Sequence, residues 1–543
     1  MSLANSITSS HTNTKKPPQG PRSKSKPSYI TRSNSIKSVS TSLNLNNNDY
    51  LSGPSDTEQG YDSEYDNDSN NNKYSISTVA ATLDNSLPSD YFKQDILSLI
   101  KSLNIPKWSK LPSKLALDLN VFNISGALTN VIYKIDPPSS KTLKKNKFIY
   151  FLNPLLLRIY GPGSDSLIDR DYELLVLSRL SKKNIGPKLL GSFSNGRFEQ
   201  WLNNAQVLKP TQVADLKLSR TIARRMKQLH IGIQLNNPEI NNGPSIWKRI
   251  DDWLNLAELT LNLNKINASN FLLSDFQTYK NIINKYKLWL YNRYKSIQDL
   301  KDSLVFCHND TQYGNILFTT STHKDLLKKF NNANLSDNNN KNDTDNVNEE
   351  EEQKEDKRLV VIDFEYAGAN VPAYDIANHF MEWLADYTNS ETAHLLVEDR
   401  YPSDKQITNF LASYIKYHST IHNNTEELEK QVKILYNDII AWRAASNIVW
   451  SLWGIISNSD FHKKVVIEDG PKGEKYKILN EDSNNIKEEE QEANEIELFD
   501  HFGYSNQKAG LVWGDLIQLG IATKDDVEHS DQIKYLPVKF FHI

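Results

Sequence analysis

Hydrophobic and polar positions divide the chain into a long polar beginning and a patterned remainder. Residues 1–85 are rich in Ser, Asn, Thr and Lys and turn acidic at DTEQGYDSEYDND (56–68). Such a segment cannot bury enough apolar surface to offset the entropy of chain ordering, so we predict a disordered tail. Helical apolar spacing then starts in FKQDILSLIKSLNI (92–105), which predicts the first helix of a folded unit.

Strand-like patterns dominate the next part of the chain. Apolar pieces of this kind occur at 117–124, 130–135 and 148–161. A strong helical pattern follows at 169–185, and PKLLGSFSNGRFEQWL then predicts a β-hairpin that turns at Asn195-Gly196. A small nucleotide-binding lobe requires this order of strands around one helix, and we assign it to residues 86–202.

The remaining pattern is mainly helical. Helical spacing is found at 216–233, 279–298, 376–387 and 428–457. We assign residues 203–543 to a large helical lobe, interrupted by acidic, low-complexity stretches at 331–357 and 474–497 that read as surface insertions. The expected fold class is therefore α+β, with a small β-rich lobe and a large helical lobe.

Two apolar runs in the second lobe are broken by polar residues in an unusual way. VFCHNDTQYGNILF (305–318) places His308, Asp310 and Asn315 on a turn between two strand-like pieces, and LVVIDFEYAGAN (359–370) places Asp363 at a strand end. A lone Asp on a turn is most often an Asx-turn. The second carboxylate at a strand end makes a phosphoryl-transfer site the better interpretation.

The chemistry assigns these residues different roles. Asp310 would orient a substrate hydroxyl and accept its proton late in the reaction, whereas Asn315 and Asp363 offer oxygen ligands to Mg²⁺. Gln312 could reach phosphate or substrate. His308 is expected to brace the loop by hydrogen bonds rather than act as a base.

Composition and charge exclude several other classes of protein. The net charge of −4 argues against a nucleic-acid partner, and the single Cys307 excludes an internal disulfide framework and a Cys-based zinc site. Met1 is followed by polar residues, so we expect no secretory leader. The apolar stretch 439–457 contains Arg443, which favours a buried helix over membrane insertion. We expect a cytoplasmic protein.

CHNDTQYGNILF and VVIDFEYAGANVPAYDIANHFMEW together resemble the signature segments of the choline/ethanolamine kinase family, most closely its fungal choline kinases. The resemblance runs from about residue 90 to the C-terminus, apart from the insertions. It implies a protein-kinase-like fold, the use of ATP and Mg²⁺, and a small cationic amino alcohol as the partner substrate. Choline would become phosphocholine, the first step of head-group synthesis for phospholipids. A homodimer is compatible with it.

The resemblance also implies the nucleotide-binding residues. ISGALTN corresponds to a phosphate-binding loop, Arg158 supplies a cation to the phosphates, and GRFEQWL is the hinge that meets adenine. Glu173, in the helix that follows Arg158, is a candidate ion-pair partner for it. The residues implied are Ser125, Gly126, Ala127, Leu128, Thr129, Asn130, Arg158, Glu199, Gln200, Trp201, Leu202, Gln312 and Asp363.

The amino-alcohol pocket follows from the same resemblance. A quaternary ammonium has no N–H to donate, so aromatic faces and carboxylates must recognise it. Trp450 and Trp453 are three residues apart and so share a helix face, while Trp442 is left as core. The substrate residues implied are Asp310, Gln312, Tyr366, Glu382, Tyr387, Trp450 and Trp453. The sequence diverges from the family beyond Tyr504.

Three alternatives stay open at this point. Ethanolamine could replace choline as the preferred substrate or share the site with it. A catalytically inactive kinase-like scaffold is a remoter alternative, against which the intact Asp310, Asn315 and Asp363 speak. Aminoglycoside phosphotransferases share the spacing of His308, Asp310 and Asn315 but lack the continuation after Asp363.

Overall fold

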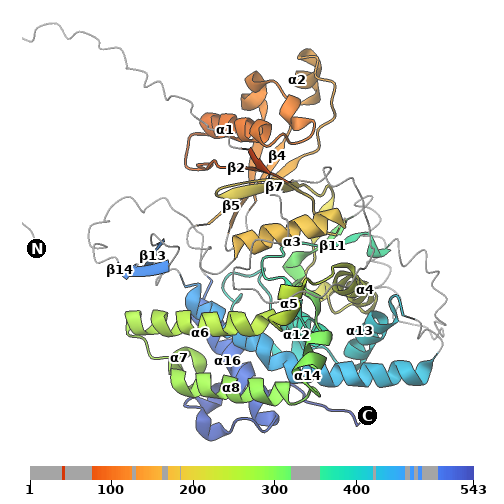
Figure 1. Ribbon diagram of the computed structural model, residues 1–543, viewed down its shortest axis with the longest axis vertical. Coiled ribbons are helices and arrows are strands. Elements are labelled where there is room, and N and C mark those ends of the chain that lie inside the picture. The colour runs from red at the N-terminus through yellow and green to blue at the C-terminus, as the bar shows by residue number, and fades with distance from the viewer. Residues whose placement is uncertain are drawn as a thin grey trace, which may run out of the picture.

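The computed structural model shows a sheet-containing lobe stacked on a helical lobe (Figure 1). It describes residues 76–124, 130–161, 169–183, 185–319, 355–419, 424–458 and 499–542, and the backbone of short strands at 40–42, 465–469 and 475–479. The predicted tail, residues 1–85, lies mostly outside the described residues. The two-lobed α+β architecture that the sequence pattern predicts is confirmed.

One mixed sheet forms the smaller lobe, with strand order β1-β2-β6-β7-β5-β4-β3. Neighbouring strands are antiparallel except for β2 and β6, which run parallel. The predicted hairpin is present as the pair β6 and β7. The strands are β1 (Ser40–Ser42), β2 (Ser77–Val79), β3 (Asn120–Ile124), β4 (Asn130–Asp136), β5 (Leu155–Tyr160), β6 (Leu189–Phe193) and β7 (Gly196–Gln200).

Two of the expected strands are shorter than their apolar runs. The 3₁₀ turn Ser113–Asp118 occupies the start of the run 117–124. In the run 148–161, only β5 is a strand, because β4 ends at Asp136 and its last residues pair with the start of β5. Ile149 and Phe151 are 85% and 74% exposed, so this part of the run is apolar without being buried.

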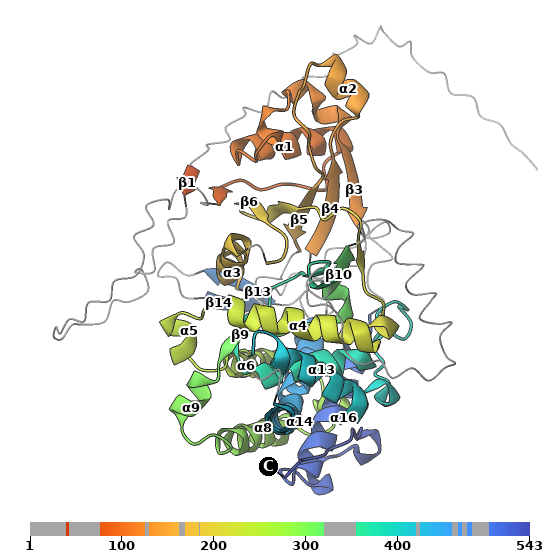
Figure 2. The same cartoon turned by 90° about the vertical axis from the view of Figure 1, so that its right-hand side faces the viewer.

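Helices cover the sheet on both sides. They are α1 (Ser89–Ser102), α2 (Ser140–Lys145) and α3 (Arg170–Lys182). Helix α3 lies between the sheet and the helical lobe (Figures 1 and 2). It begins where the side chain of Asp169 accepts a hydrogen bond from the Tyr172 amide, and the acidic Asp171 and Glu173 suit the positive end of its dipole.

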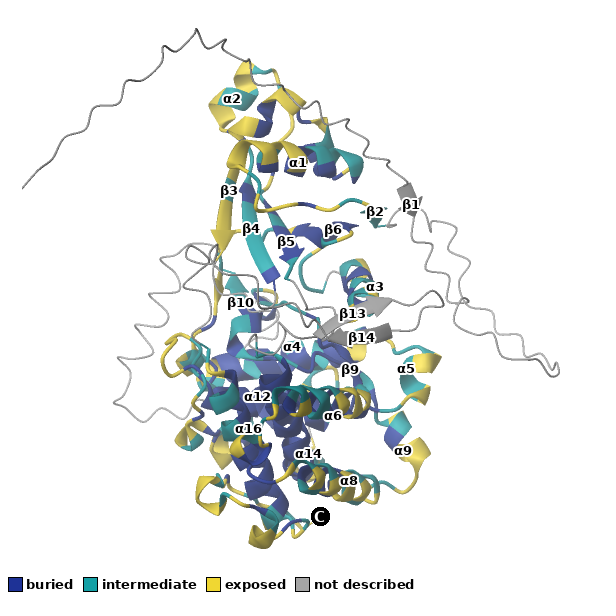
Figure 3. Ribbon diagram, turned by 90° about the vertical axis from the view of Figure 1, so that its left-hand side faces the viewer, coloured by how far each residue is buried: buried dark blue, intermediate teal, exposed yellow. Residues whose placement is uncertain are grey.

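The larger lobe is built around the long helix α14. Its helices are α4 (Leu216–Gly232), α5 (Asn237–Asn241), α6 (Ser245–Asn264), α7 (Ser269–Leu272), α8 (Phe276–Tyr291), α9 (Ile297–Asp302), α12 (Pro372–Met381), α13 (Asp404–Lys416), α14 (Thr425–Ile456) and α16 (His501–Gln518). Helices α6, α12, α13 and α16 all pack against α14. Figure 3 shows α14 buried over most of its length.

Helix α14 is long and apolar enough to cross a membrane, but its apolar window is entirely buried in the fold. It also carries Arg443, whose guanidinium binds the Asp515 carboxylate of α16 at 2.5 and 3.0 Å. Such a pair is retained in a protein interior because each charge satisfies the other. The prediction of a buried helix at 439–457 is confirmed.

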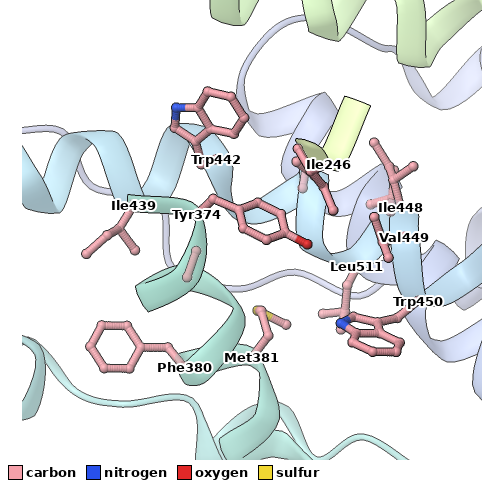
Figure 4. Close-up of a cluster of buried hydrophobic side chains, with 14 of the residues drawn as sticks. Ile246, Tyr374, Phe380, Met381, Ile439, Trp442, Ile448, Val449, Trp450 and Leu511 are labelled. Atoms are coloured by element: carbon pink, nitrogen blue, oxygen red, sulfur yellow. The ribbon is translucent and has the colours of Figure 1, made fainter. Parts of the chain in front are cut away.

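The core around α14 draws on several helices. Figure 4 shows Ile246 of α6, Tyr374 of α12, Trp442 of α14 and Leu511 of α16 in one cluster of buried side chains. Trp442 is fully buried there, as expected of a core residue, and its indole N–H donates to the Tyr294 hydroxyl at 3.0 Å.

Some helix boundaries differ from the predicted ones. The pattern 279–298 contains two helices, because α8 ends at Tyr291 and Ser296 caps the start of α9 by accepting from the Asp299 amide. The pattern 376–387 begins earlier, since Pro372 starts α12, and ends in the 3₁₀ turn Glu382–Leu384.

Short antiparallel sheets carry the polar motifs between the lobes. Strand β9 (Val305–Cys307) pairs with β12 (Gly368–Asn370), and β10 (Ile316–Thr319) pairs with both β8 (Ala205–Val207) and β11 (Leu359–Val361). Strands β13 (Val465–Asp469) and β14 (Lys475–Leu479) form a separate hairpin. Strand β14 falls inside the stretch 474–497 that we expected to be a surface insertion.

The end of the other expected insertion, 331–357, is also structured. Residues 331–354 lie outside the described residues. Asp356, however, is buried and receives the Arg224 guanidinium on both carboxylate oxygens at 2.9 to 3.0 Å. Asp356 is therefore anchored in the fold, although it falls within the predicted insertion.

Candidate active site

The loop that joins β9 to β10 passes between two sheets and holds the first polar motif. It begins at His308, after β9, and ends in the 3₁₀ turn Tyr313–Asn315, directly before β10. The second motif leaves β11 beside it, because the Ile362 amide donates to the Asn315 carbonyl at 2.9 Å. The two motifs therefore meet, as the sequence predicted.

Asp375 of α12 fixes the backbone of this loop. Its carboxylate accepts hydrogen bonds from the amides of His308 and Asn309 at 2.9 and 2.8 Å, and His230 lies at 2.9 Å from the same group. Burial would raise the pKa of Asp375, but these donors and the nearby histidines outweigh it and lower the pKa. A charged carboxylate is thus built into the interior to shape the loop.

Asp310 directly follows Asn309, whose unusual backbone conformation is stabilised by the hydrogen bond to Asp375. Asn309 has φ +65°, a conformation that non-glycine residues seldom adopt. Its own amide group donates to the Tyr366 carbonyl at 3.0 Å and accepts from Asn370 at 3.2 Å. The positive φ turns the chain so that Asp310 is held at the site.

The surroundings of the Asp310 carboxyl group favour its neutral form. The Asn315 side-chain amide donates to its Oδ2 at 2.9 Å and to its carbonyl at 3.0 Å. Burial raises the pKa of Asp310 well above its ordinary value, and the charges of Glu382 and Asp363 raise it further. The Asp310 side chain is thus fixed by Asn315 in surroundings that disfavour its charged form.

His308 and Cys307 serve the loop rather than the chemistry. The His308 ring donates from Nε2 to the Ile362 carbonyl at 2.9 Å, which confirms the bracing role, and burial lowers its pKa. The Cys307 thiol is buried, and burial raises its pKa well above the ordinary value. A thiol held neutral in this way is a poor nucleophile.

Asp363 lies at the end of β11 with φ +65°. The Arg158 guanidinium contacts its carboxylate at 3.2 Å. Burial alone would raise the pKa of Asp363, but the positive charges of Arg158 and Arg197 dominate and lower it. Asp363 is consequently an anion at neutral pH, as a ligand for a cation must be.

A further pair of carboxylates surrounds Asp363. Oxygens of Glu173, Asp363 and Glu365 lie within 4.8 Å of one another. Burial and the charges of Asp363 and Glu173 raise the pKa of Glu365 to about 8. Crowded oxygen ligands of this kind suit a hard divalent cation such as Mg²⁺, so the residues present fit the expected metal.

Arg158 belongs to a buried ionic network, as the cost of an unpaired strand arginine predicted. Besides Asp363, its guanidinium lies 3.6 Å from Glu199. Glu173 binds Arg197 at 2.9 Å and Arg170 at 2.8 Å, and its charge also favours the charged form of Arg158. The helix glutamate is therefore shared among several arginines rather than devoted to Arg158.

The expected hinge lies at the end of β7, and its residues have separate tasks in the structure. The Glu199 carboxylate forms an ion pair with Arg197 at 2.6 Å, and the backbone amide of Gln200 donates to the Lys188 carbonyl at 2.9 Å. Trp201 and Leu202 are half-buried beyond the strand, where Lys134 lies 5.3 Å from the Trp201 ring. Of the four expected residues, Trp201 and Leu202 lie beyond the strand ladder.

The expected phosphate loop can be followed only at its end. Ser125, Gly126, Ala127, Leu128 and Thr129 lie outside the described residues. Asn130 starts β4 and accepts a hydrogen bond from Arg170 at 3.3 Å. Gln312 is engaged locally, because its side-chain oxygen accepts from the Gly314 amide at 2.8 Å and so caps the turn before β10.

The expected pocket residues come together as an aromatic cluster. Tyr366 meets Trp450 edge-on with ring centroids 5.3 Å apart, and Trp450 meets Trp453 at 6.0 Å. Tyr504 of α16 joins them, 5.8 Å from Trp453. The Trp450 indole is fixed by donating to the Asn378 side chain at 2.7 Å. Aromatic side chains from three separate segments are thus gathered together, and the Tyr366 carbonyl ties them to Asn309, the residue before Asp310.

Glu382 adds a carboxylate to this cluster. Its Oε2 accepts a hydrogen bond from the Tyr387 hydroxyl at 2.7 Å, and its Oε1 lies 3.0 Å from Lys508. Burial raises the pKa of the Tyr387 hydroxyl well above its ordinary value, and the Glu382 charge adds to this. Tyr387 therefore stays protonated and orients the carboxylate.

Several residues of the site were not identified from the sequence. Arg249 of α6 stacks over the Tyr366 ring at 5.1 Å and donates to its carbonyl at 3.3 Å. Asp375 and Lys508 are the others with direct polar roles. Asp375 carried a signal, an acidic residue within an otherwise apolar helix pattern. Arg249 and Lys508 stand in unremarkable helical sequence and carried none.

Comparison with known proteins gives a consistent result. The sequence model for choline/ethanolamine kinase matches residues 121–512, and that for the choline kinase N terminus matches residues 67–116. The chain is 40% identical to the choline kinase of Saccharomyces cerevisiae, over 86% of this chain and 82% of that one. It is 35% identical to the ethanolamine kinase of the same yeast, over 84% of this chain and 83% of that one.

A solved structure shares the fold. The choline kinase of Cryptosporidium parvum superposes with a TM-score of 0.54 at 20% identity, covering 80% of this chain and 98% of that chain. At this identity the likeness concerns the fold alone. The prediction of a protein-kinase-like fold is confirmed.

Proposed function

Since this chain belongs to the choline/ethanolamine kinase family, we propose that it transfers the γ-phosphoryl group of ATP to the hydroxyl of choline. The products are phosphocholine and ADP. The observation that carries the proposal is the meeting of the two motifs, because Asn315 donates to the Asp310 carboxylate at 2.9 Å and the amide of Ile362, next to Asp363, donates to the Asn315 carbonyl at 2.9 Å. An acceptor whose cationic head lies against the aromatic cluster would present its hydroxyl to Asp310.

Asp310 orients the acceptor in this mechanism. The hydroxyl of choline donates a hydrogen bond to the Asp310 carboxylate, and its oxygen attacks the γ-phosphorus as the bond to the β-γ bridging oxygen breaks. The proton passes to Asp310 late, because an alcohol is too weak an acid to ionise first. The hydrogen bond from Asn315 holds the carboxylate in place for this transfer.

Residues of this chain also prepare the other side of the reaction. Asn315 and Asp363 would hold Mg²⁺, which when bound neutralises charge on the phosphates. Arg158 brings a buried positive charge to the same place. The aromatic cluster of Tyr366, Trp450 and Trp453 attracts a quaternary ammonium through its ring faces.

Ethanolamine is a second candidate acceptor, alone or beside choline. The similarity to a yeast ethanolamine kinase favours it. A catalytically inactive scaffold is disfavoured, because Asp310, Asn315 and Asp363 occupy one site. A cytoplasmic location and a homodimer stay predictions.

The test is ADP release from the full-length protein with ATP and Mg²⁺, on a panel of choline, ethanolamine and the methylated intermediates. We expect choline to be turned over most efficiently. Asp310→Ala should abolish turnover and leave folding intact, while the matched control Asp251→Ala, in a surface ion pair with Lys287, should leave turnover unchanged. Full turnover in Asp310→Ala would sink the assignment.

A further inference from the structure

A buried lysine of the protein pairs with the carboxylate of Glu382. Lys508 Nζ lies 3.0 Å from Glu382 Oε1, and the two side chains are 0% and 3% exposed. The same ammonium lies 5.3 Å from the centre of the Tyr504 ring. A carboxylate and an aromatic face would also attract the cationic head of a substrate.

We infer that Lys508 determines which amino alcohol the site prefers, by neutralising Glu382 and so favouring a quaternary over a primary ammonium. The inference rests on the proposed function and deepens it. It concerns the part of α16 beyond Tyr504, where the sequence diverges from the family.

The reason lies in what each head group needs from the pocket. A primary ammonium carries N–H donors that lose their water on entering, and it must find acceptors in exchange. Glu382 offers few, because Lys508 engages Oε1 and the Tyr387 hydroxyl engages Oε2. Ethanolamine therefore faces a carboxylate whose oxygens are already engaged and whose charge is balanced.

A trimethylammonium has no such requirement. It has no N–H to satisfy, and its attraction to ring faces needs no carboxylate. Trp450 and Trp453 supply those faces independently of Lys508, since they extend from α14. Neutralising the charge of Glu382 thus weakens the binding of choline less than the binding of ethanolamine.

Lys508 is held in this place by the fold. It follows Tyr504 by one helical turn on α16, which packs against α14. A buried ammonium is costly without a partner, so the side chain keeps its contact with Glu382. The pair is consequently present before any substrate arrives.

The experiment compares kcat/KM for choline and for ethanolamine in the full-length protein and in Lys508→Met. We expect the ethanolamine-to-choline ratio to rise about tenfold, the value of one hydrogen bond to a charged group. Lys508→Arg, which keeps the cation, should retain the wild-type ratio. A purely structural lysine would lower both kcat/KM values together and leave the ratio unchanged, which would overturn the inference.

A second variant decides the matter if Lys508→Met does not fold. The double variant Glu382→Gln with Lys508→Met replaces the ion pair, whose two charges cancel, by two uncharged side chains. The kcat/KM values for choline and for ethanolamine can both fall, but their ratio should stay near that of the wild type. A collapse of ethanolamine turnover alone would show that Glu382 binds the substrate directly, and would refute the inference. If the wild type phosphorylates neither amino alcohol, the proposed function itself fails.

Discussion

His379 gives the site a specific sensitivity to acid. Its Nδ1–H donates to the Thr311 carbonyl at 2.8 Å, and its Nε2 accepts from the Trp383 indole at 3.2 Å. Because Nε2 accepts a hydrogen bond, it cannot be protonated without losing that bond. Burial lowers the pKa of His379 to about 4, from an ordinary value of 6.5. The neutral ring therefore braces the loop that carries Asp310.

The loss of stability on acidification can be worked out from these values. The unfolded chain takes up a proton at this residue below pH 6.5, whereas the folded chain does so only near pH 4. The stabilisation is complete above 6.5 and is lost as the pH falls towards 4. Each pH unit in that window is worth about 1.4 kcal/mol, so lowering the pH from 7 to 5 removes about 2 kcal/mol.

The assay is urea unfolding near pH 7 and near pH 5, followed by tryptophan fluorescence. Wild type should lose about 2 kcal/mol more than His379→Gln between the two conditions, whatever the variant's stability at pH 7. Replacement of the exposed His542 by Gln is the matched control and should behave as wild type. Equal losses in wild type and His379→Gln would refute the reasoning.

Three further outcomes are expected. Trp450→Ala should reduce kcat/KM for choline more than for ethanolamine, because it removes an aromatic face; equal retention of both would remove the cage. Cys307 should react with a thiol reagent only after unfolding, and rapid labelling of the native protein would contradict its burial. Asp515→Asn should lower the free energy of unfolding by about 3–5 kcal/mol, since it leaves Arg443 buried without a counter-charge; a loss under 1 kcal/mol in urea unfolding would exclude this role.

Periodicity predicted the helices well because their apolar faces are buried. Helix α14 extends from Thr425 to Ile456, against a pattern read at 428–457. The pattern at 148–161 forms a strand only from Leu155 to Tyr160, because apolar content alone does not provide a pairing partner and β4 ends opposite Leu155. Strand length depends on a neighbour distant in sequence, which a local pattern does not contain.

The residues of the site likewise divide into those with a local sequence signal and those without one. Asp310, Asn315 and Asp363 could be identified because polar residues interrupt apolar strands, a local signal. Lys508 gave no such signal, since its partner Glu382 lies on another segment and only packing of α16 brings them together. Gln312 was expected to face phosphate or substrate, but a contact two residues away engages its side chain.

Because Asp356 is anchored, the position of β11 does not depend on the length of the segment between β10 and β11. The polar segment after β10 leaves at Thr319 and returns at Arg358, whose backbone carbonyl accepts from the Thr319 amide at 2.8 Å. With Arg224 holding Asp356 next to this junction, β11 starts from a fixed point however many residues precede it. The segment 320–354 is therefore a natural place to insert a reporter domain or a tether, since β11, which leads to Asp363, is anchored after it by Arg358 and Asp356.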